Sequence, residues 1–366
     1  MYSSYDIDLY SPAGVHTQSV EAFATLTLTR SVNTVGALTL TLPWSPVVWQ
    51  HLPKDALIDV WRRRENGARQ RVMNTLWLVS KRAVILATDG TQTIQVSAVD
   101  CIDLLRRWQI TYDTATEQAT KTAPAESVIK SVVSEQLVTR GGLPITVESD
   151  SFLGFSVSIA AGWQQVLSTV QSVAQTSTQY GSYMAFDFDP TAMTAWTFRT
   201  YLGQRGMDRS SGSAIPLTLS DKAGDVTSGT YMEDYSSCDS QVIALGQTAK
   251  GATTTATATD ALLDGLGPFA HTESNTTMQN TTDVAYTLPC VAQAELRARR
   301  PSLCLSQAIL PQSPSCQYGV QYDFGDKLSC SFAGLSFTAW LETLAVSVDA
   351  SSGQETFTGT LNGVLS

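Results

Sequence analysis

Residues 321–328 read QYDFGDKL and contain the tripeptide Asp-Phe-Gly, which in protein kinases holds magnesium against ATP. A kinase also requires a glycine-rich loop over the phosphates, a lysine on a strand and an HRD catalytic loop. None of the chain's three histidines, at positions 16, 51 and 271, is followed by Arg-Asp. We therefore do not interpret this tripeptide as a kinase element.

A turn that leads into a strand explains the same residues. Gly325 can adopt a positive φ, and the aspartates beside it can accept hydrogen bonds from nearby backbone amides. We expect Phe324 to be buried while the polar residues face water. Leu328, Cys330 and Phe332 then alternate as in a half-buried strand.

Asp187 and Asp189 are the next candidates for chemistry. On a strand, two carboxylates spaced by two residues project from the same face, as a metal-binding or acid/base pair does. Pro190 follows directly and no third ligand is apparent, so we favour the interpretation that the two aspartates flank a turn.

Other enzymatic arrangements have little support in the sequence. No His/Cys spacing is typical of a zinc site, and no complete nucleophile motif is present, although distant Ser, His and Asp side chains could still converge in space. We predict that the protein is not an enzyme and has no catalytic residue, no cofactor and no metal site. The cysteines form no CxxC pair, so we expect buried, reduced thiols at positions 101, 238, 290, 304, 316 and 330.

Composition limits the remaining classes of function. The chain has 366 residues, more than a single core usually serves, so we expect two or more domains. Charged residues make up 15%, below the about 25% of typical soluble domains, and Thr and Ser replace them, which favours strands. The net charge of -10 and the pI near 4.8 argue against binding nucleic acid by phosphate neutralisation. We find no signal peptide and no apolar run of about 18 residues, so no membrane-spanning segment is predicted.

The first hundred residues predict antiparallel strands. In residues 24–29 (ATLTLT) and again in 38–42, leucines alternate with threonines, and this period of two indicates half-buried strands. Asp89-Gly90 separates two further strand-like runs, which is a strong hairpin signal. The pattern favours a small barrel or sandwich within residues 1–110.

Helices and aromatic-rich strands follow. Pro124 begins a helical pattern that stops at Gly141-Gly142, and a second pattern extends from Trp163 to Ala174. We predict that residues 111–212 form an α+β middle domain.

Strands resume at residue 215 and dominate again from residue 303. Between them lies the low-complexity segment 251–260 (GATTTATATD), which we expect to be an exposed arm, and a short helix over 292–300. The sequence therefore predicts a second β unit made of residues 213–250 and 301–366, with residues 251–300 inserted as a small arm or subdomain.

The order of these pieces resembles a known family. A Gly-x-Asp-Arg signature at residues 206–209 comes first, followed by a β run, a variable loop and a short helix. The Asp-Phe-Gly-Asp-Lys segment at residues 323–327 then starts the final strands. In this order the chain looks like the tail-tip or baseplate hub proteins of long-tailed bacteriophages, including the siphophage hub family often described simply as phage tail protein. The residues that carry the resemblance are Gly206, Asp208, Arg209, Asp323, Gly325 and Asp326.

The resemblance implies a mostly β fold with two tube-like antiparallel β-barrels, the second interrupted by an insertion, and an α+β middle domain. It implies a homotrimeric ring with pseudo-sixfold symmetry that joins the hexameric tail tube to threefold tip or fibre components. The implied partners are a distal tail or tail tube protein, the tape measure protein, and tip or fibre proteins, and phage DNA would pass through the channel without specific binding. The implied location is the tail tip of the virion, assembled in the host cytoplasm. Because the chain ends after the second barrel, we expect no appended hydrolase or fibre domain.

Two other functions stay open at this point. One is a tail-associated cell-wall hydrolase whose catalytic residues are distant in sequence. The other is a carbohydrate-binding adhesin that uses some of the eight tryptophans as stacking platforms, although most of them fall in apolar patterns typical of core packing.

Overall fold

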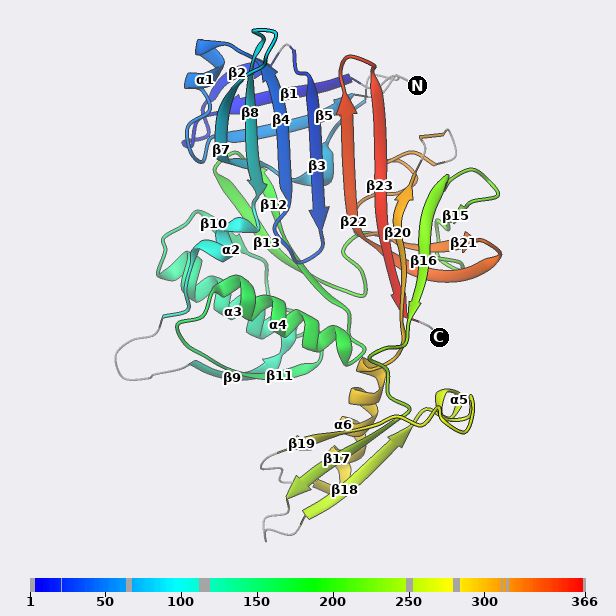
Figure 1. Cartoon of the computed structure of the whole chain (residues 1–366). Coiled ribbons are helices and arrows are strands. Elements are labelled where there is room, and N and C mark those ends of the chain that lie inside the picture. Colours follow the sequence, from blue (N-terminus) through cyan, green and yellow to red (C-terminus); the bar gives the residue numbers. More distant parts are fainter. Residues whose placement is uncertain are drawn as a thin grey trace.

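The computed structural model describes residues 4–20, 22–63, 68–111, 119–247, 253–278, 284–310, 312–313 and 316–364. Strands dominate this part of the chain, and the helices over Ala125–Val133 and Val166–Gln179 lie together in its middle (Figure 1). The chain is therefore mostly β with a helix-containing middle unit.

The strands are β1 (Ser4–Tyr10), β2 (His16–Val20), β3 (Thr25–Ser31), β4 (Ala37–Pro43), β5 (Leu57–Arg63), β6 (Arg69–Arg71), β7 (Trp77–Leu86), β8 (Gln92–Asp100), β9 (Ala119–Pro124), β10 (Ile145–Val147), β11 (Ser156–Ala161), β12 (Met184–Ala192), β13 (Ala195–Leu202), β14 (Asp208–Arg209), β15 (Thr218–Ser220), β16 (Ser228–Asp234), β17 (Gln241–Gln247), β18 (Thr253–Thr259), β19 (Glu273–Met278), β20 (Ser302–Ile309), β21 (Lys327–Phe332), β22 (Leu335–Asp349) and β23 (Gln354–Val364). The helices are α1 (Pro46–Gln50), α2 (Asp103–Arg107), α3 (Ala125–Val133), α4 (Val166–Gln179), α5 (Ala261–Asp264) and α6 (Val284–Ala298), with a 3-10 turn at Val72–Asn74 and a π-helical continuation of α3 at Ser134–Thr139.

Alternation of leucine and threonine directs one face of the N-terminal strands into the core. In β3, Leu26 and Leu28 have no accessible surface, while Thr25 and Thr27 are exposed. β7 and β8 pair as a hairpin, and Gly90 in its turn has a φ of +86°. The predicted strands and the predicted hairpin are confirmed.

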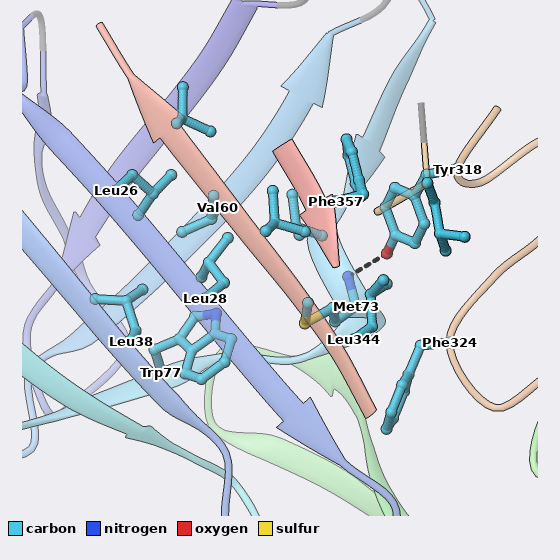
Figure 2. Packing of buried hydrophobic residues seen from close by; sticks show 14 of the residues in the cluster. Leu26, Leu28, Leu38, Val60, Met73, Trp77, Tyr318, Phe324, Leu344 and Phe357 are labelled. Carbon is cyan, nitrogen blue, oxygen red and sulfur yellow. Dashed lines mark hydrogen bonds between the residues drawn. The ribbon is translucent and has the colours of Figure 1, made fainter. Parts of the chain in front are cut away.

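The N-terminal and C-terminal strands belong to one sheet. Its path is β16-β20-β23-β22-β3-β4-β8-β7-β5-β1-β2, and the second half of β22 pairs antiparallel with β3. The first half of β22 pairs with β21, and β23 lies along its other side. A single hydrophobic core lies under both sets of strands, and it includes Leu28 and Leu38 of the first set and Leu344 and Phe357 of the last (Figure 2).

The middle unit contains the two predicted helices. α3 and α4 pack on each other and on neighbouring strands, and their apolar residues share a second core with aromatic residues of β12 and β13. β12 continues through Pro190, so the interpretation that Asp187 and Asp189 flank a turn is wrong. Pro190 is tolerated because β12 lies at the edge of the sheet β10-β13-β12, where a missing N–H breaks no ladder.

A smaller unit, which we call the arm, consists of β17 to β19 and α6 (Figure 1). β17 pairs with both β18 and β19, so this unit starts at Gln241, whereas the sequence placed residues up to 250 in the second β unit. The low-complexity Thr/Ala segment is strand β18, in which Ala256 and Ala258 contribute to the arm's core while Thr255 and Thr257 are exposed. Among the described helices, none is long and apolar enough to cross a membrane.

The cysteines differ in burial. All six are free; Cys101, Cys316 and Cys330 are buried, and Cys290 is exposed. The prediction of buried thiols is confirmed for the first three. It is wrong for Cys290, and Cys238 and Cys304 are only partly buried.

Candidate functional site

The two sequence motifs lie against each other in space. β14, which contains Asp208 and Arg209, pairs in parallel with the start of β21. The carboxylate of Asp326 accepts a hydrogen bond from the Met207 amide at 2.6 Å and one from Arg209 Nε at 2.7 Å. Asp326 is 1% exposed, so the expectation that the polar residues of this segment face water is wrong for it. The arginine and the amide groups compensate its burial.

Glycines make this close approach possible. The Gly206 amide donates to the Gly325 carbonyl at 2.9 Å, and a Cβ on Gly206 would lie 2.1 Å from Oδ1 of Asp326. Gly325 has a φ of +85°, which confirms the predicted positive φ. The Asp323 amide donates to Oδ2 of Asp326 at 2.8 Å, so the turn folds back onto the same carboxylate.

This turn continues into a buried network of charges. Phe324 is buried, as predicted, and its ring centroid lies 4.5 Å from the guanidinium carbon of Arg205 and 5.2 Å from that of Arg30. Arg205 donates to Asp187 through Nε at 2.7 Å and to the Phe324 carbonyl through Nη1 at 3.0 Å. The aromatic ring and the carbonyl therefore both help to stabilise cations in the interior.

Arg30 connects the N-terminal strands with the middle unit. Its side chain has no accessible surface, and it donates to Asp100 through Nε at 2.9 Å and to Asp187 through Nη2 at 2.6 Å. Its Nη1 donates to the carbonyl of Met73 at 2.8 Å. Because Arg30 lies in β3, Asp100 ends β8 and Asp187 lies in β12, one guanidinium fixes three elements.

The pKa values in this network follow from how many cations each carboxylate contacts. Burial lowers the pKa of Arg30, but Asp187 and Asp100 more than offset it, so the pKa is raised. Burial also dominates at Asp100 and raises its pKa, since it shares Arg30 with Asp187. At Asp187 burial is outweighed by Arg205 and Arg30, and the pKa is lowered. Asp187 is therefore held as an anion by two arginines.

Neither Arg30 nor Arg205 was predicted from the sequence to be a buried partner of Asp187. A signal for Arg30 was present, because it continues the period-two pattern of Leu26 and Leu28 and so must point into the core. Arg205 directly precedes Gly206 of the recognised motif. No local pattern indicated that both would contact Asp187.

A second buried ion pair connects the first strands with the last. Arg62 in β5 donates to both carboxylate oxygens of Glu355 in β23, at 2.6 and 2.9 Å. Tyr5 of β1 also donates to Glu355. The Met73 amide donates to the Tyr318 hydroxyl at 2.7 Å, which attaches the loop before the recognised turn to the N-terminal unit (Figure 2).

Asp187 and Asp189 do not form a shared site. Asp189 accepts a hydrogen bond from Asn74 Nδ2 at 3.1 Å and lies 3.4 Å from Arg199 Nε, while Asp187 contacts other arginines. Among the described residues, no group of three or more His, Cys, Asp or Glu side chains is placed to hold a metal ion.

Two clusters of Ser, His and Asp side chains converge among the described residues. Around α5, Asp264 Oδ1 lies 2.6 Å from His271 Nδ1 and accepts a hydrogen bond from Ser240 Oγ at 3.2 Å, so this serine contacts the carboxylate. The other cluster lies on the β1–β2 hairpin. Both Ser19 Oγ, at 3.3 Å, and Asp8 Oδ1, at 3.7 Å, approach Nε2 of His16. Ser19 donates directly to Asp8 at 2.6 Å. A catalytic triad requires the serine and the carboxylate on opposite ring nitrogens, so this geometry does not activate the hydroxyl.

The sequence of residues 6–357 matches a family model described as Siphovirus ReqiPepy6 Gp37-like protein. The chain belongs to this siphovirus protein family. The resemblance to phage tail proteins, first seen in the order of short motifs, is confirmed. A search of curated protein sequences finds no match.

Solved structures of tail proteins share the fold along nearly the whole chain. The tail protein from Neisseria meningitidis MC58 has a TM-score of 0.62 at 11% identity, covering 98% of this chain and 97% of that chain. The 43 kDa tail protein of prophage MuSo2 from Shewanella oneidensis has a TM-score of 0.60 at 14% identity, covering 98% of both chains. Prophage tail protein gp18 from Listeria monocytogenes EGD-e has a TM-score of 0.55 at 9% identity, covering 98% of this chain and 94% of that chain. At these identities the likeness concerns the fold.

Proposed function

We propose that this tail protein is the structural hub of a phage tail tip or baseplate. Three copies form a ring with pseudo-sixfold symmetry, which joins the hexameric tail tube to threefold tip or fibre components and surrounds the path of the DNA. The observation that carries the proposal is the presence of two sets of strands in one chain, joined through β3 and β22. Three such chains supply six β units, the number that a sixfold tube requires.

In this proposal each set of strands corresponds to one tube-like barrel. The first comprises residues 1–110 and the second comprises 213–250 with 301–366, separated by the middle domain of 111–212. The arm takes β17 from the second barrel, since that strand pairs only with other strands of the arm among the described residues. The arm interrupts the second barrel and projects away from the large sheet (Figure 1).

The buried ion pairs support a role that depends on shape. Arg30 and Arg62 each connect elements far apart in the sequence, so the two β units and the middle unit are held in one arrangement. A hub that transmits contacts between a tube and a tip benefits from such rigidity. We propose that the protein acts without catalysis, since the buried carboxylate Asp187 is neutralised by arginines and the His16 cluster lacks triad geometry.

The composition supports passage of DNA without binding. A net charge of -10 disfavours phosphate contacts, so a channel built from this chain would let DNA slide. The proposed partners are a distal tail or tail tube protein on one side, the tape measure protein, and tip or fibre proteins on the other. The proposed location is the tail tip of the virion.

Light scattering tests the assembly. We expect the purified protein, at high concentration, to have the mass of a trimer of its 39.4 kDa chain. A monodisperse monomer under these conditions contradicts the proposal. A zymogram on cell walls distinguishes the hub from a tail-associated hydrolase: the hub leaves the gel unchanged, whereas a cleared band supports the hydrolase.

A further inference from the structure

A cleft with a volume of about 510 Å³ lies between the middle unit and the C-terminal strands. One wall comes from the end of α4, the loop 181–183 that precedes β12 and the end of β13. The other wall comes from β21, β22 and β23. None of the contacts described above uses this cleft. Its lining includes Tyr183, Leu202, Lys327, Trp340, Glu342 and Asn362.

Glu342 occupies a special position in β22. The pairing of β22 with β23 shifts register between Leu341 and Thr343, so Glu342 is the extra residue of a β-bulge. At the same point β22 changes its other neighbour from β21 to β3. Bulges redirect side chains and are frequent beside functional sites.

The Glu342 carboxylate has no cationic partner among the described residues. Its Oε2 accepts a hydrogen bond from Asn362 Nδ2 at 3.0 Å. Burial raises the pKa of Glu342, and the Asn362 hydrogen bond offsets this only in part. This differs from Asp187 and Glu355, whose buried carboxylates are both paired with arginine.

Aromatic side chains form an apolar wall beside this carboxylate. The Tyr183 and Trp340 rings are stacked, with centroids 5.2 Å apart and planes 8° from parallel. The Trp340 indole N–H donates to the Gly203 carbonyl at 2.8 Å, which fixes the ring. Burial and the nearby Glu342 charge raise the pKa of Tyr183, and its hydroxyl has no partner among the described residues.

Lys327 also lines the cleft but is engaged elsewhere. Its Nζ lies 3.4 Å from Asp208 and 5.9 Å from the Trp340 ring centroid. In the β21–β22 ladder Lys327 is opposite Trp340. The lysine therefore neutralises Asp208 of the family motif and leaves Glu342 unpaired.

We propose that this cleft is a docking site for an arginine side chain of a partner protein. An arginine stem can lie along the Tyr183 and Trp340 wall while its planar fork of donors reaches the Glu342 carboxylate. A neutral or anionic group would leave that carboxylate desolvated without compensation. The site bridges the middle unit and the C-terminal strands, and it can bind arginine whether or not the chain acts as a hub.

The direct test uses N-acetyl-L-arginine amide as the probe and the full chain labelled with 5-fluorotryptophan. Fluorine NMR follows the Trp340 signal, assigned by its loss in a W340F chain. We expect a saturable shift of this signal in the wild type, and affinity at least about tenfold weaker in Glu342→Gln, since the charge-assisted hydrogen bonds are lost. The matched neutral probe, N-acetyl-L-citrulline amide, has the same shape and is expected to bind at least about tenfold more weakly to the wild type.

A second measurement identifies the source of the arginine. If another copy of this chain supplies it, the cleft is already filled in the assembly, and Glu342→Gln weakens self-association by about tenfold or more in light scattering. If another tail protein supplies it, self-association is unchanged and only probe binding is lost. The proposal is overturned if Glu342→Gln alters neither probe binding nor assembly, or if arginine and citrulline probes bind equally. Because a second copy would occupy the cleft, the two probes are compared on the wild type at a concentration at which light scattering shows monomers. This comparison decides the question even if the variant fails to fold.

Discussion

Asp187 is the residue on which most of the buried electrostatics depend. It accepts hydrogen bonds from Arg30 in β3 and from Arg205, which follows β13, and burial makes each of these charges costly without a partner. Two arginines around one aspartate leave the network well compensated, with Asp100 as the second acceptor for Arg30. The contact therefore fixes the middle unit against the N-terminal strands.

Replacement of Asp187 by Asn tests this role. We expect Asp187→Asn to lower the free energy of unfolding by about 3–5 kcal/mol, because two arginines lose a buried counter-charge. Urea unfolding at pH 7 measures the change. Asp189→Asn is the matched control, since Asp189 is 31% exposed and its removal should cost no more than about 1 kcal/mol. Equal effects of the two substitutions contradict the role given to Asp187.

The effect of Asp187 also depends on pH in a defined direction. Its pKa is lowered in the folded chain, so its contribution is complete above the unfolded value of about 3.9 and is lost as the pH falls through the folded value. We expect the stability difference between wild type and Asp187→Asn to be constant from pH 7 to about pH 5 and to shrink below about pH 4. A stability difference between the two chains that grows as the pH falls would contradict this role of Asp187.

Gly206 tests the contact between the two sequence motifs. In Gly206→Ala the new Cβ would lie 2.1 Å from the Asp326 carboxylate and 2.8 Å from its amide nitrogen, so the turn must move. We expect a loss of about 1–3 kcal/mol in urea unfolding, typical of overpacking. Gly267→Ala is the control, because nothing lies within 4 Å of a Cβ built there. A Gly206→Ala chain as stable as that control would show that the contact is not tight.

For single residues, the sequence predicted turn conformation and burial better than it predicted which residues contact one another. The turn at Gly325 and the burial of Phe324 followed from local chemistry. The burial of Asp326 did not, since Arg209 and the Met207 amide reach it from a segment more than a hundred residues earlier. Contacts between distant segments leave no local pattern, so the network could be seen only in the fold.

At the scale of elements, periodicity predicted most strands and the helices α3 and α4. Helix α6, predicted as a short helix over 292–300, begins earlier and spans Val284–Ala298. Leucine–threonine alternation identified β3 and β4, and apolar spacing identified α3 and α4. β18 was missed as a strand because its alternating alanines are too small to indicate a buried face. The joining of β22 to β3 was not predicted either, since strand order depends on pairings that are remote in the sequence.

The arm has a much smaller core than the large sheet. Its buried apolar residues are mostly small, with Leu288 and Leu296 of α6 as the largest, whereas the large sheet buries several aromatic side chains. Less buried apolar area means a smaller free energy of local opening. The arm should therefore open independently of the rest of the chain.

Hydrogen–deuterium exchange tests this difference. We expect amides of β17 and β18 to exchange faster than those of β3 and β22. Leu296→Ala should accelerate exchange in the arm by at least about tenfold and leave β3 and β22 unchanged, because a buried leucine is removed from a separate core. Equal protection of the two regions, or a change that spreads to β3, contradicts the independence of the arm.

At the scale of the whole molecule, the two β units form a curved, continuous sheet with the middle unit on one side and the arm projecting from it (Figure 1). The shared core and the ion pairs Arg30–Asp187 and Arg62–Glu355 hold this arrangement. Family membership and the fold of other tail proteins place the chain among phage tail components. To act as a hub, three such rigid chains must assemble into the proposed ring.

Electron microscopy of the purified protein tests the formation of this ring most directly. We expect class averages of a ring with a central opening and a threefold or pseudo-sixfold outline, in which each chain contributes two β units to the wall. Isolated compact particles that never surround an axis, at concentrations where the protein is pure and folded, would contradict it.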